Sequence, residues 1–175
     1  MSPARRSLLA VFTGHGKGKT TAALGVLLRA WGHDLRAVMI SFVKAKSGNW
    51  GEQKAARKIG VEVIASGRGF TWLSKDLQED KALAGEGWRM AQEKISSGLY
   101  DVVILDEFTY PLSYGWLPLA DVIDFLVNRP EGVSIIVTGR DAPQPLIDAA
   151  DLVTEMREVK HPFEAGVKAL PGIDF

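Results

Sequence analysis

The sequence of 175 residues contains no cysteine and only three histidines. The lack of cysteine excludes disulfide bonds and thiolate metal sites, and it suits a reducing cytoplasm, where we expect this protein to work. Positive and negative side chains balance at 21 each, so no excess of positive charge predicts binding to nucleic acid or to an anionic membrane. The first apolar run, residues 8–12, is too short for a signal-peptide core or a membrane span. We therefore expect a partner other than nucleic acid or membrane.

Repeats, low-complexity tracts and long Pro/Ser linkers are also missing from the sequence. The chain is long enough to bury a hydrophobic core without disulfide bonds or a structural metal. We expect one domain over residues 1–175, with a short N-terminal arm at about residues 1–7 and a C-terminal tail at about residues 158–175.

Six short apolar runs rich in Val and Ile alternate with helical patterns: residues 8–12, 37–42, 61–65, 102–105, 134–137 and 152–154. Two apolar stripes at helical spacing lie between them: Leu24, Leu27, Leu28 and Trp31, and then Leu119, Val122, Ile123 and Leu126. This alternation predicts an α/β fold, with a mostly parallel six-stranded sheet and helices on both faces. Ligands of such sheets bind at the carboxyl ends of the strands, so the loops there are expected to hold the site.

A glycine-rich segment follows the first run and precedes a helical pattern, which is the setting of a phosphate-binding loop. Its glycines allow successive backbone N–H groups to face an anion at the start of a helix. Lys19 is expected to reach phosphate oxygens, and the Thr20 hydroxyl to ligate a divalent cation. The predicted nucleotide contacts are Gly14, His15, Gly16, Lys17, Gly18, Lys19, Thr20 and Thr21.

The loop departs from the general pattern at Thr13, which stands where a glycine is usual. The alternative interpretation is a glycine-rich turn that binds nothing, but the complete Gly-Lys-Thr-Thr ending favours a ligand. His15 is expected to shape the loop or form a hydrogen bond rather than act as a base.

Asp106 and Glu107 end the fourth apolar run, so both carboxylates should lie at the carboxyl edge of a buried strand. This resembles a Walker B arrangement, in which an acid helps to hold Mg²⁺ beside the triphosphate. A helix cap or a solvated acid is the alternative, and the spacing does not tell which acid would touch the metal.

Other candidates are weaker when each is considered alone. Phe70 and Trp72 lie in a glycine-flanked loop, where packing and ligand contact are equally good interpretations. Arg29, Lys44, Lys46 and Asn49 are in position to meet phosphate or ribose, although solvated surface is the simpler assignment. Residues 138–140, Thr-Gly-Arg, follow a buried strand and lie near the site by topology.

Several phrases together resemble one family. These are Phe12 to Ala23 around the glycine-rich loop, Gly-Phe-Thr-Trp at 69–72, Val-Ile-Leu-Asp-Glu at 103–107, and the tail from Val159 to Phe175. Taken together, the sequence is similar to the ATP:corrinoid adenosyltransferases, from about Leu8 to the end. The loop of that family also tends to begin with Thr-Gly-x-Gly, although Asn is common where this chain has His15. The N-terminal segment before the first run is shorter than in well-known relatives.

The resemblance implies a P-loop NTPase (RecA-like) fold and transfer of the 5′-deoxyadenosyl group of ATP to Co(I) of a reduced corrinoid, with release of triphosphate. It implies Lys19, Thr20 and Glu107 as catalytic residues, with Mg²⁺ or Mn²⁺ held by Thr20 and by Glu107 or Asp106. Arg29 joins the ATP contacts, while Phe70 and Trp72 contact the corrinoid. A homodimer and an electron-donating flavoprotein reductase are the implied partners.

The residues alone leave two other functions open. A P-loop ATPase or phosphotransferase would act at the terminal phosphate and yield ADP. A regulatory module would bind ATP without turnover.

Overall fold

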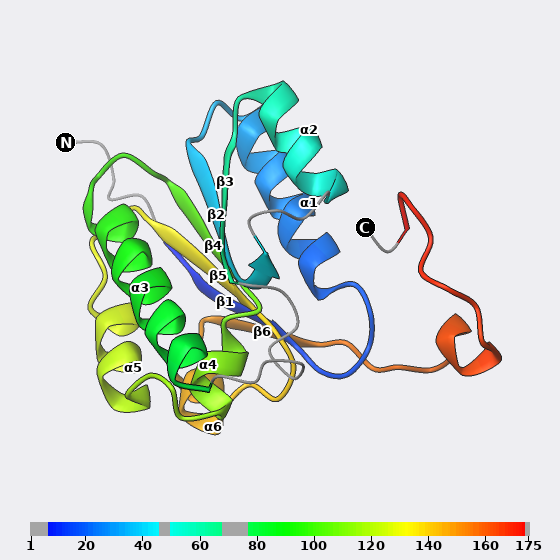
Figure 1. Cartoon of the computed structure of the whole chain (residues 1–175). Helices are drawn as coiled ribbons and strands as arrows, with labels where there is room; N and C mark the ends of the chain where they lie inside the picture. Colours follow the sequence, from blue (N-terminus) through cyan, green and yellow to red (C-terminus); the bar gives the residue numbers. More distant parts are fainter. Residues whose placement is uncertain (1–6, 46–49, 68–76, 174–175) are drawn as a thin grey trace.

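The computed structural model describes residues 7–45, 50–67 and 77–173 (Figure 1). Strands and helices alternate along the chain: β1 (Leu9–Thr13), α1 (Lys19–Gly32), β2 (Ala37–Ala45), α2 (Gly51–Ile59), β3 (Glu62–Gly67), α3 (Leu77–Ser96), β4 (Val102–Asp106), α4 (Thr109–Ser113), α5 (Leu119–Val127), β5 (Ser134–Thr138), α6 (Gln144–Ala149) and β6 (Leu152–Glu155). A short 3₁₀ helix, Pro162–Ala165, follows in the tail. Within the described ranges, no helix is both long and apolar enough to cross a membrane.

The six strands form one sheet in the order β3-β2-β4-β5-β1-β6. Every neighbouring pair is parallel, so the predicted sheet is confirmed and is fully rather than mostly parallel. The first strand lies between the last two: Val11 of β1 stands opposite Val137 of β5 and Val153 of β6. Because all strands run the same way, their carboxyl ends meet at one edge of the sheet.

Helices cover both faces of the sheet, as the sequence predicts. Alternate strand residues face α1 and α2 on one side and α3 to α6 on the other (Figure 1). On the second side, Val122 and Leu126 of α5 are fully buried, and Leu119 and Ile123 pack beside them. The stripe predicted for α5 is therefore confirmed.

The stripe predicted for α1 is wrong for two of its four residues. Leu28 and Trp31 are 57% and 46% exposed, whereas Ala23, Leu27 and Ala30 form the buried face. The small side chains of Ala23 and Ala30 let α1 lie close to the strands, so the buried stripe is rotated by about one residue, or roughly 100°.

An aromatic stack fixes the chain just after β4. Phe108 has no exposed surface, and its ring centroid lies 4.6 Å from that of Phe42 and 5.1 Å from that of Trp88. Such ring pairs contribute roughly 0.5–1.5 kcal/mol each beyond the area that they bury. The preceding residues, Asp106 and Glu107, are thereby held at the edge of the sheet.

Candidate functional site

Thr13 is the last residue of β1 rather than part of the curled loop. Its hydroxyl accepts a hydrogen bond from the Ala142 backbone N–H at 3.2 Å, which joins the loop to the segment after β5. The loop then takes positive φ angles at Gly14 (92°) and Gly18 (113°), which favour glycine. Position 13 is therefore part of an extended strand and does not need glycine. The threonine there also supplies a hydroxyl that contacts the segment after β5.

The glycines of the loop meet the segment that follows β6. The Gly16 N–H donates to the Met156 carbonyl at 2.7 Å, and the Met156 N–H donates to the Thr13 carbonyl at 2.8 Å. A Cβ on Gly14 would lie 2.5 Å from the Met156 carbonyl oxygen, and one on Gly16 would lie 2.7 Å from the Arg157 carbonyl carbon. Residues 156 and 157 therefore support the loop, at a distance that only glycine permits.

Lys19, the first residue of α1, folds back over this loop. Its Nζ donates to the carbonyl oxygens of Gly14 and Gly16, each at 2.7 Å. Burial, and then repulsion from Arg140, lowers the pKa of Lys19, against the opposing effect of Glu107. The ammonium thus lies where an anion held by the loop would meet it.

Asp106 is a completely buried carboxylate at the end of β4. Its Oδ1 accepts from the Thr20 hydroxyl at 2.8 Å and from the Thr138 hydroxyl at 2.9 Å. Its Oδ2 accepts from the Ser41 hydroxyl at 3.2 Å and lies 3.3 Å from Lys44 Nζ. Three hydroxyl donors and one ammonium, from two strands and one helix, therefore converge on one carboxylate, which satisfies it.

Glu107 has a backbone φ of 59°, an uncommon value for a residue other than glycine. Its N–H donates to the Thr138 hydroxyl at 2.9 Å, so that hydroxyl has its own proton free for Asp106. Burial, and then the charge of Asp106, raises the pKa of Glu107 to about 7. Unlike Asp106, Glu107 lines the open cavity.

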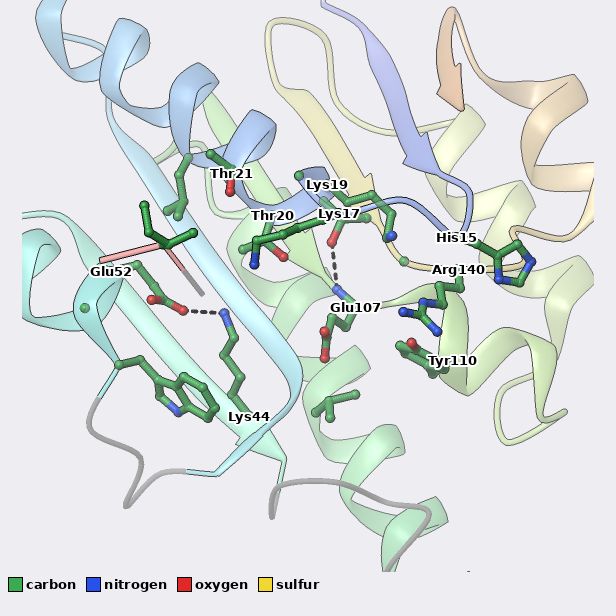
Figure 2. A pocket seen from close by; sticks show the side chains of 18 of the residues that line it. His15, Lys17, Lys19, Thr20, Thr21, Lys44, Glu52, Glu107, Tyr110 and Arg140 are labelled. Carbon is green, nitrogen blue, oxygen red and sulfur yellow. Dashed lines mark hydrogen bonds and ion pairs between the residues drawn. The ribbon is translucent and has the colours of Figure 1, made fainter. Parts of the chain in front are cut away.

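A cavity of about 1000 Å³ opens at this edge of the sheet, at the upper end of the usual range for ligand sites. Figure 2 shows Lys19 and Thr20 between two groups of side chains, with Lys44 and Glu52 on one side and His15, Tyr110 and Arg140 on the other. Lys17, Lys19, Lys44 and Arg140 supply basic groups to the lining, while Tyr110 and Tyr114 add aromatic surface. The cavity can therefore hold a polyanion beside a flat apolar group.

Arg29 lies outside this cavity. It lines a neighbouring hollow of about 720 Å³ beside α1, which shares Lys17, Gly18 and Thr21 with the main cavity. The shared residues place the two hollows next to each other at the loop. The tail returns to both, because Ile173 lines each of them.

The structure brings most of the predicted residues together. His15, Lys17, Gly18, Lys19, Thr20, Thr21 and Glu107 line the main cavity, as do Lys44 and Thr138 to Arg140. His15 is exposed, with its Nε2 3.2 Å from Asp141 Oδ1. The predictions for Phe70, Trp72, Lys46 and Asn49 lie outside the described residues.

Some lining residues were not singled out by sequence. Glu52, Tyr110 and Tyr114 are examples, although each lies in or next to a loop expected at the carboxyl edge of the sheet. Only the sheet topology could have indicated these residues, because a single glutamate or tyrosine does not form a sequence motif.

Two hard oxygen donors, from Thr20 and Glu107, line the cavity beside the phosphate loop. The Thr20 hydroxyl donates its proton to Asp106, so its lone pairs stay available, and the Glu107 carboxylate lines the same cavity. Throughout the described part of the chain, no group of three or more His, Cys, Asp or Glu side chains is placed to bind a metal. The donor set fits a cation such as Mg²⁺, which takes few protein ligands and keeps several waters.

Comparison with known proteins identifies one family. The model of "ATP:corrinoid adenosyltransferase BtuR/CobO/CobP" matches residues 5–175. The corrinoid adenosyltransferase of Escherichia coli (strain K12) is 42% identical over 172 residues, which cover 97% of this chain and 86% of the relative. Corrinoid adenosyltransferase CobA of Salmonella typhimurium is also 42% identical with the same coverage. The Pseudomonas aeruginosa corrinoid adenosyltransferase is 39% identical over 97% of this chain and 84% of its own length.

Proposed function

Because the chain belongs to the ATP:corrinoid adenosyltransferase family, we propose that it transfers the 5′-deoxyadenosyl group of ATP to the cobalt of a reduced corrinoid. The electron pair of Co(I) attacks the 5′ carbon of ATP. The bond from that carbon to the triphosphate oxygen breaks, and triphosphate leaves with the bonding electrons. The product belongs to adenosylcobalamin formation or salvage.

One observation carries the proposal beyond family membership. The cavity joins a phosphate loop, with Lys19 and Thr20, to an aromatic wall at Tyr110 and Tyr114. Co(I) is itself the nucleophile, so the reaction needs no protein nucleophile or general base. The task left to the protein is to position both substrates and stabilise the leaving polyanion.

Lys19 and the loop amides are the groups that we assign to the triphosphate. On ATP binding, the Lys19 ammonium exchanges the two loop carbonyls for phosphate oxygens. Arg29, in the adjoining hollow, is then placed for the sugar or base end of ATP. This assignment places positive charge where negative charge develops during the reaction, on the departing triphosphate.

For the metal, we assign Thr20 and Glu107 as the protein ligands of Mg²⁺ or Mn²⁺. Asp106 is fully buried, already accepts from three hydroxyls and is paired with Lys44, which supports an indirect role for it through Thr20. The cation would neutralise charge on the triphosphate.

On the corrinoid side, Phe70 and Trp72 are assigned by the family resemblance as the pair beneath the corrin ring. Removal of the lower axial ligand eases the reduction of Co(II) to Co(I). We propose a flavoprotein reductase as the electron donor.

We also propose a single nucleotide-binding domain that forms homodimers. Large apolar side chains along the tail are exposed, including Val159 at 88% and Phe163 at 78%, and such surface commonly marks an interface. Sedimentation at several protein concentrations tests the dimer, and a constant monomer mass contradicts it.

The decisive experiment incubates the purified protein with ATP, Mg²⁺ and chemically reduced cobalamin under anaerobic conditions. The corrinoid spectrum and the phosphate products are followed together, with Lys19→Ala as the inactive control. Light-sensitive adenosylcobalamin and triphosphate in equal amounts support the proposal. ADP and phosphate with an unchanged corrinoid would indicate an ATPase or phosphotransferase, and unchanged ATP would indicate a regulatory module.

A further inference from the structure

The side chain of Lys44 reaches the face of the sheet that carries α1 and the phosphate loop. Regular alternation along β2 would place it on the opposite face. In β2, Ser41 contacts Asp106 on the α1 face, while Phe42 packs against Phe108 on the opposite face. Regular alternation would place the Lys44 side chain on the same face of the sheet as Phe42. The register of β2 with β3 shifts between Ser41 and Ala45, and Lys44 Nζ instead lies 3.3 Å from Asp106 Oδ2. Such irregularities typically re-aim a side chain beside a functional site.

The ammonium of Lys44 is held from several sides. It donates to Glu52 Oε1 at the start of α2, and it lies 5.5 Å from the ring centroid of Trp50. The side chains of Lys44 and Glu52 are 14% and 11% exposed, and that of Asp106 is not exposed at all. A fixed, poorly solvated positive charge therefore touches a buried carboxylate.

Asp106 needs that charge because its other partners are neutral. The hydroxyls of Thr20, Thr138 and Ser41 supply hydrogen bonds without charge. An isolated buried carboxylate is costly, whereas a paired and hydrogen-bonded one persists. Thr20 belongs to the first turn of α1, and Thr138 ends β5. The carboxylate thus ties together two elements that border the phosphate loop.

We propose that Lys44 is a positioning residue of the phosphate site: its ammonium holds the Asp106 carboxylate, which in turn fixes Thr20 and Thr138 around the triphosphate. Lys44 acts through Asp106 and does not touch the nucleotide. The inference rests on the proposed function only in naming triphosphate as the ligand.

The first test compares Lys44→Met with Lys54→Met by isothermal titration of inorganic triphosphate and, separately, by corrinoid binding. Lys54 lies on the exposed side of α2, so both variants lose one positive charge. We expect Lys44→Met to weaken triphosphate binding about tenfold or more, since breaking a buried pair is strongly destabilising. Lys54→Met should change it less than twofold, and neither variant should alter corrinoid affinity. Equal triphosphate losses in the two variants would overturn the proposal, as would an equal loss of triphosphate and corrinoid binding in Lys44→Met.

The second test uses Asp106→Asn as a background, which also covers the case in which Lys44→Met alone does not fold. With the carboxylate gone, adding Lys44→Met should cost no further triphosphate affinity. An additional tenfold loss in that background would mean that Lys44 acts on the ligand directly, which refutes the positioning role. Both tests measure binding without turnover. A wild-type protein that binds triphosphate but makes no adenosylcobalamin would therefore refute the proposed function and leave this inference standing.

Discussion

Thr20 and Asp106 are joined across 86 positions of sequence by a hydrogen bond of 2.8 Å, in which the Thr20 hydroxyl donates to Oδ1 of the carboxylate. The direction of this bond fixes what the hydroxyl can do next. Its proton is used inside the protein, so its lone pairs are left for the cavity. The bond therefore links the sheet interior to the first turn of α1.

Replacing Thr20 by Val should keep the shape of the residue and remove both functions of the hydroxyl. We expect kcat/KM for ATP to fall by about 100-fold, in line with the loss of one transition-state contact. Stability should fall by roughly 1–3 kcal/mol, because Asp106 loses a donor in a buried setting. Urea unfolding and steady-state kinetics measure the two effects. Thr20→Ser should retain most of both, and equal defects in Ser and Val would contradict the role of the hydroxyl.

Glu107→Gln is expected to weaken the activation of transfer by Mg²⁺ more than it weakens the binding of metal-free ATP. The substitution removes a carboxylate that lines the cavity but leaves its shape. The Mg²⁺ concentration that gives half-maximal transfer should rise about tenfold or more, because the amide is a poorer ligand for a hard cation. Glu131→Gln, at an exposed position, removes the same charge and should behave as wild type. An unchanged Mg²⁺ titration for Glu107→Gln would show that the metal has other ligands.

Phe70→Ala is expected to separate reduction from transfer. If Phe70 displaces the lower ligand of cobalt, its loss should impair assays that begin with Co(II) at least about tenfold more than assays that begin with Co(I). Both assays use the same protein sample, so folding and ATP binding are controlled. Equal losses from the two starting states would remove this role from Phe70.

Two glycines of α3 give a matched pair for packing. A Cβ on Gly87 would lie 2.8 Å from Ser66 Oγ and 3.0 Å from Phe42 Cε1, whereas one on Gly85 would meet nothing within 4 Å. Alanine is favoured over glycine in a helix by about 1 kcal/mol. Gly85→Ala should therefore raise the free energy of unfolding by roughly 0.5–1 kcal/mol. Gly87→Ala should lower it by about 1–3 kcal/mol through overpacking. Equal gains would mean that α3 can move away from β2 and β3 without cost.

Local patterns in the sequence predict the sheet well. Each buried strand is a short apolar run bounded by turn residues, and the parallel order follows from the intervening helices. The same reasoning predicts that the loop with Lys19 and the pair Asp106–Glu107 meet at one edge of the sheet. The stripe on α1 shows the limit of the method, because periodicity does not choose between Leu27 with two alanines and Leu28 with Trp31.

Contacts between distant segments were not predictable in the same way. The orientation of Lys44 depends on an irregularity in β2, and regular alternation gives the opposite face. The support of Gly14 and Gly16 by Met156 depends on β6 lying beside β1, which no short motif encodes. Tyr110 lines the cavity from the first turn of α4, just after the buried Phe108. These features arise from tertiary arrangement rather than from local preference.

The place of β1 between β5 and β6 has a consequence for how the protein is made. Translation delivers the phosphate loop before the strands on both sides of β1, and before the backbone at Met156 and Arg157 that supports the loop. A nascent chain therefore carries the loop sequence long before it can hold the loop shape. Synthesis must therefore pass Arg157 before the loop has the neighbours that shape a site for ATP.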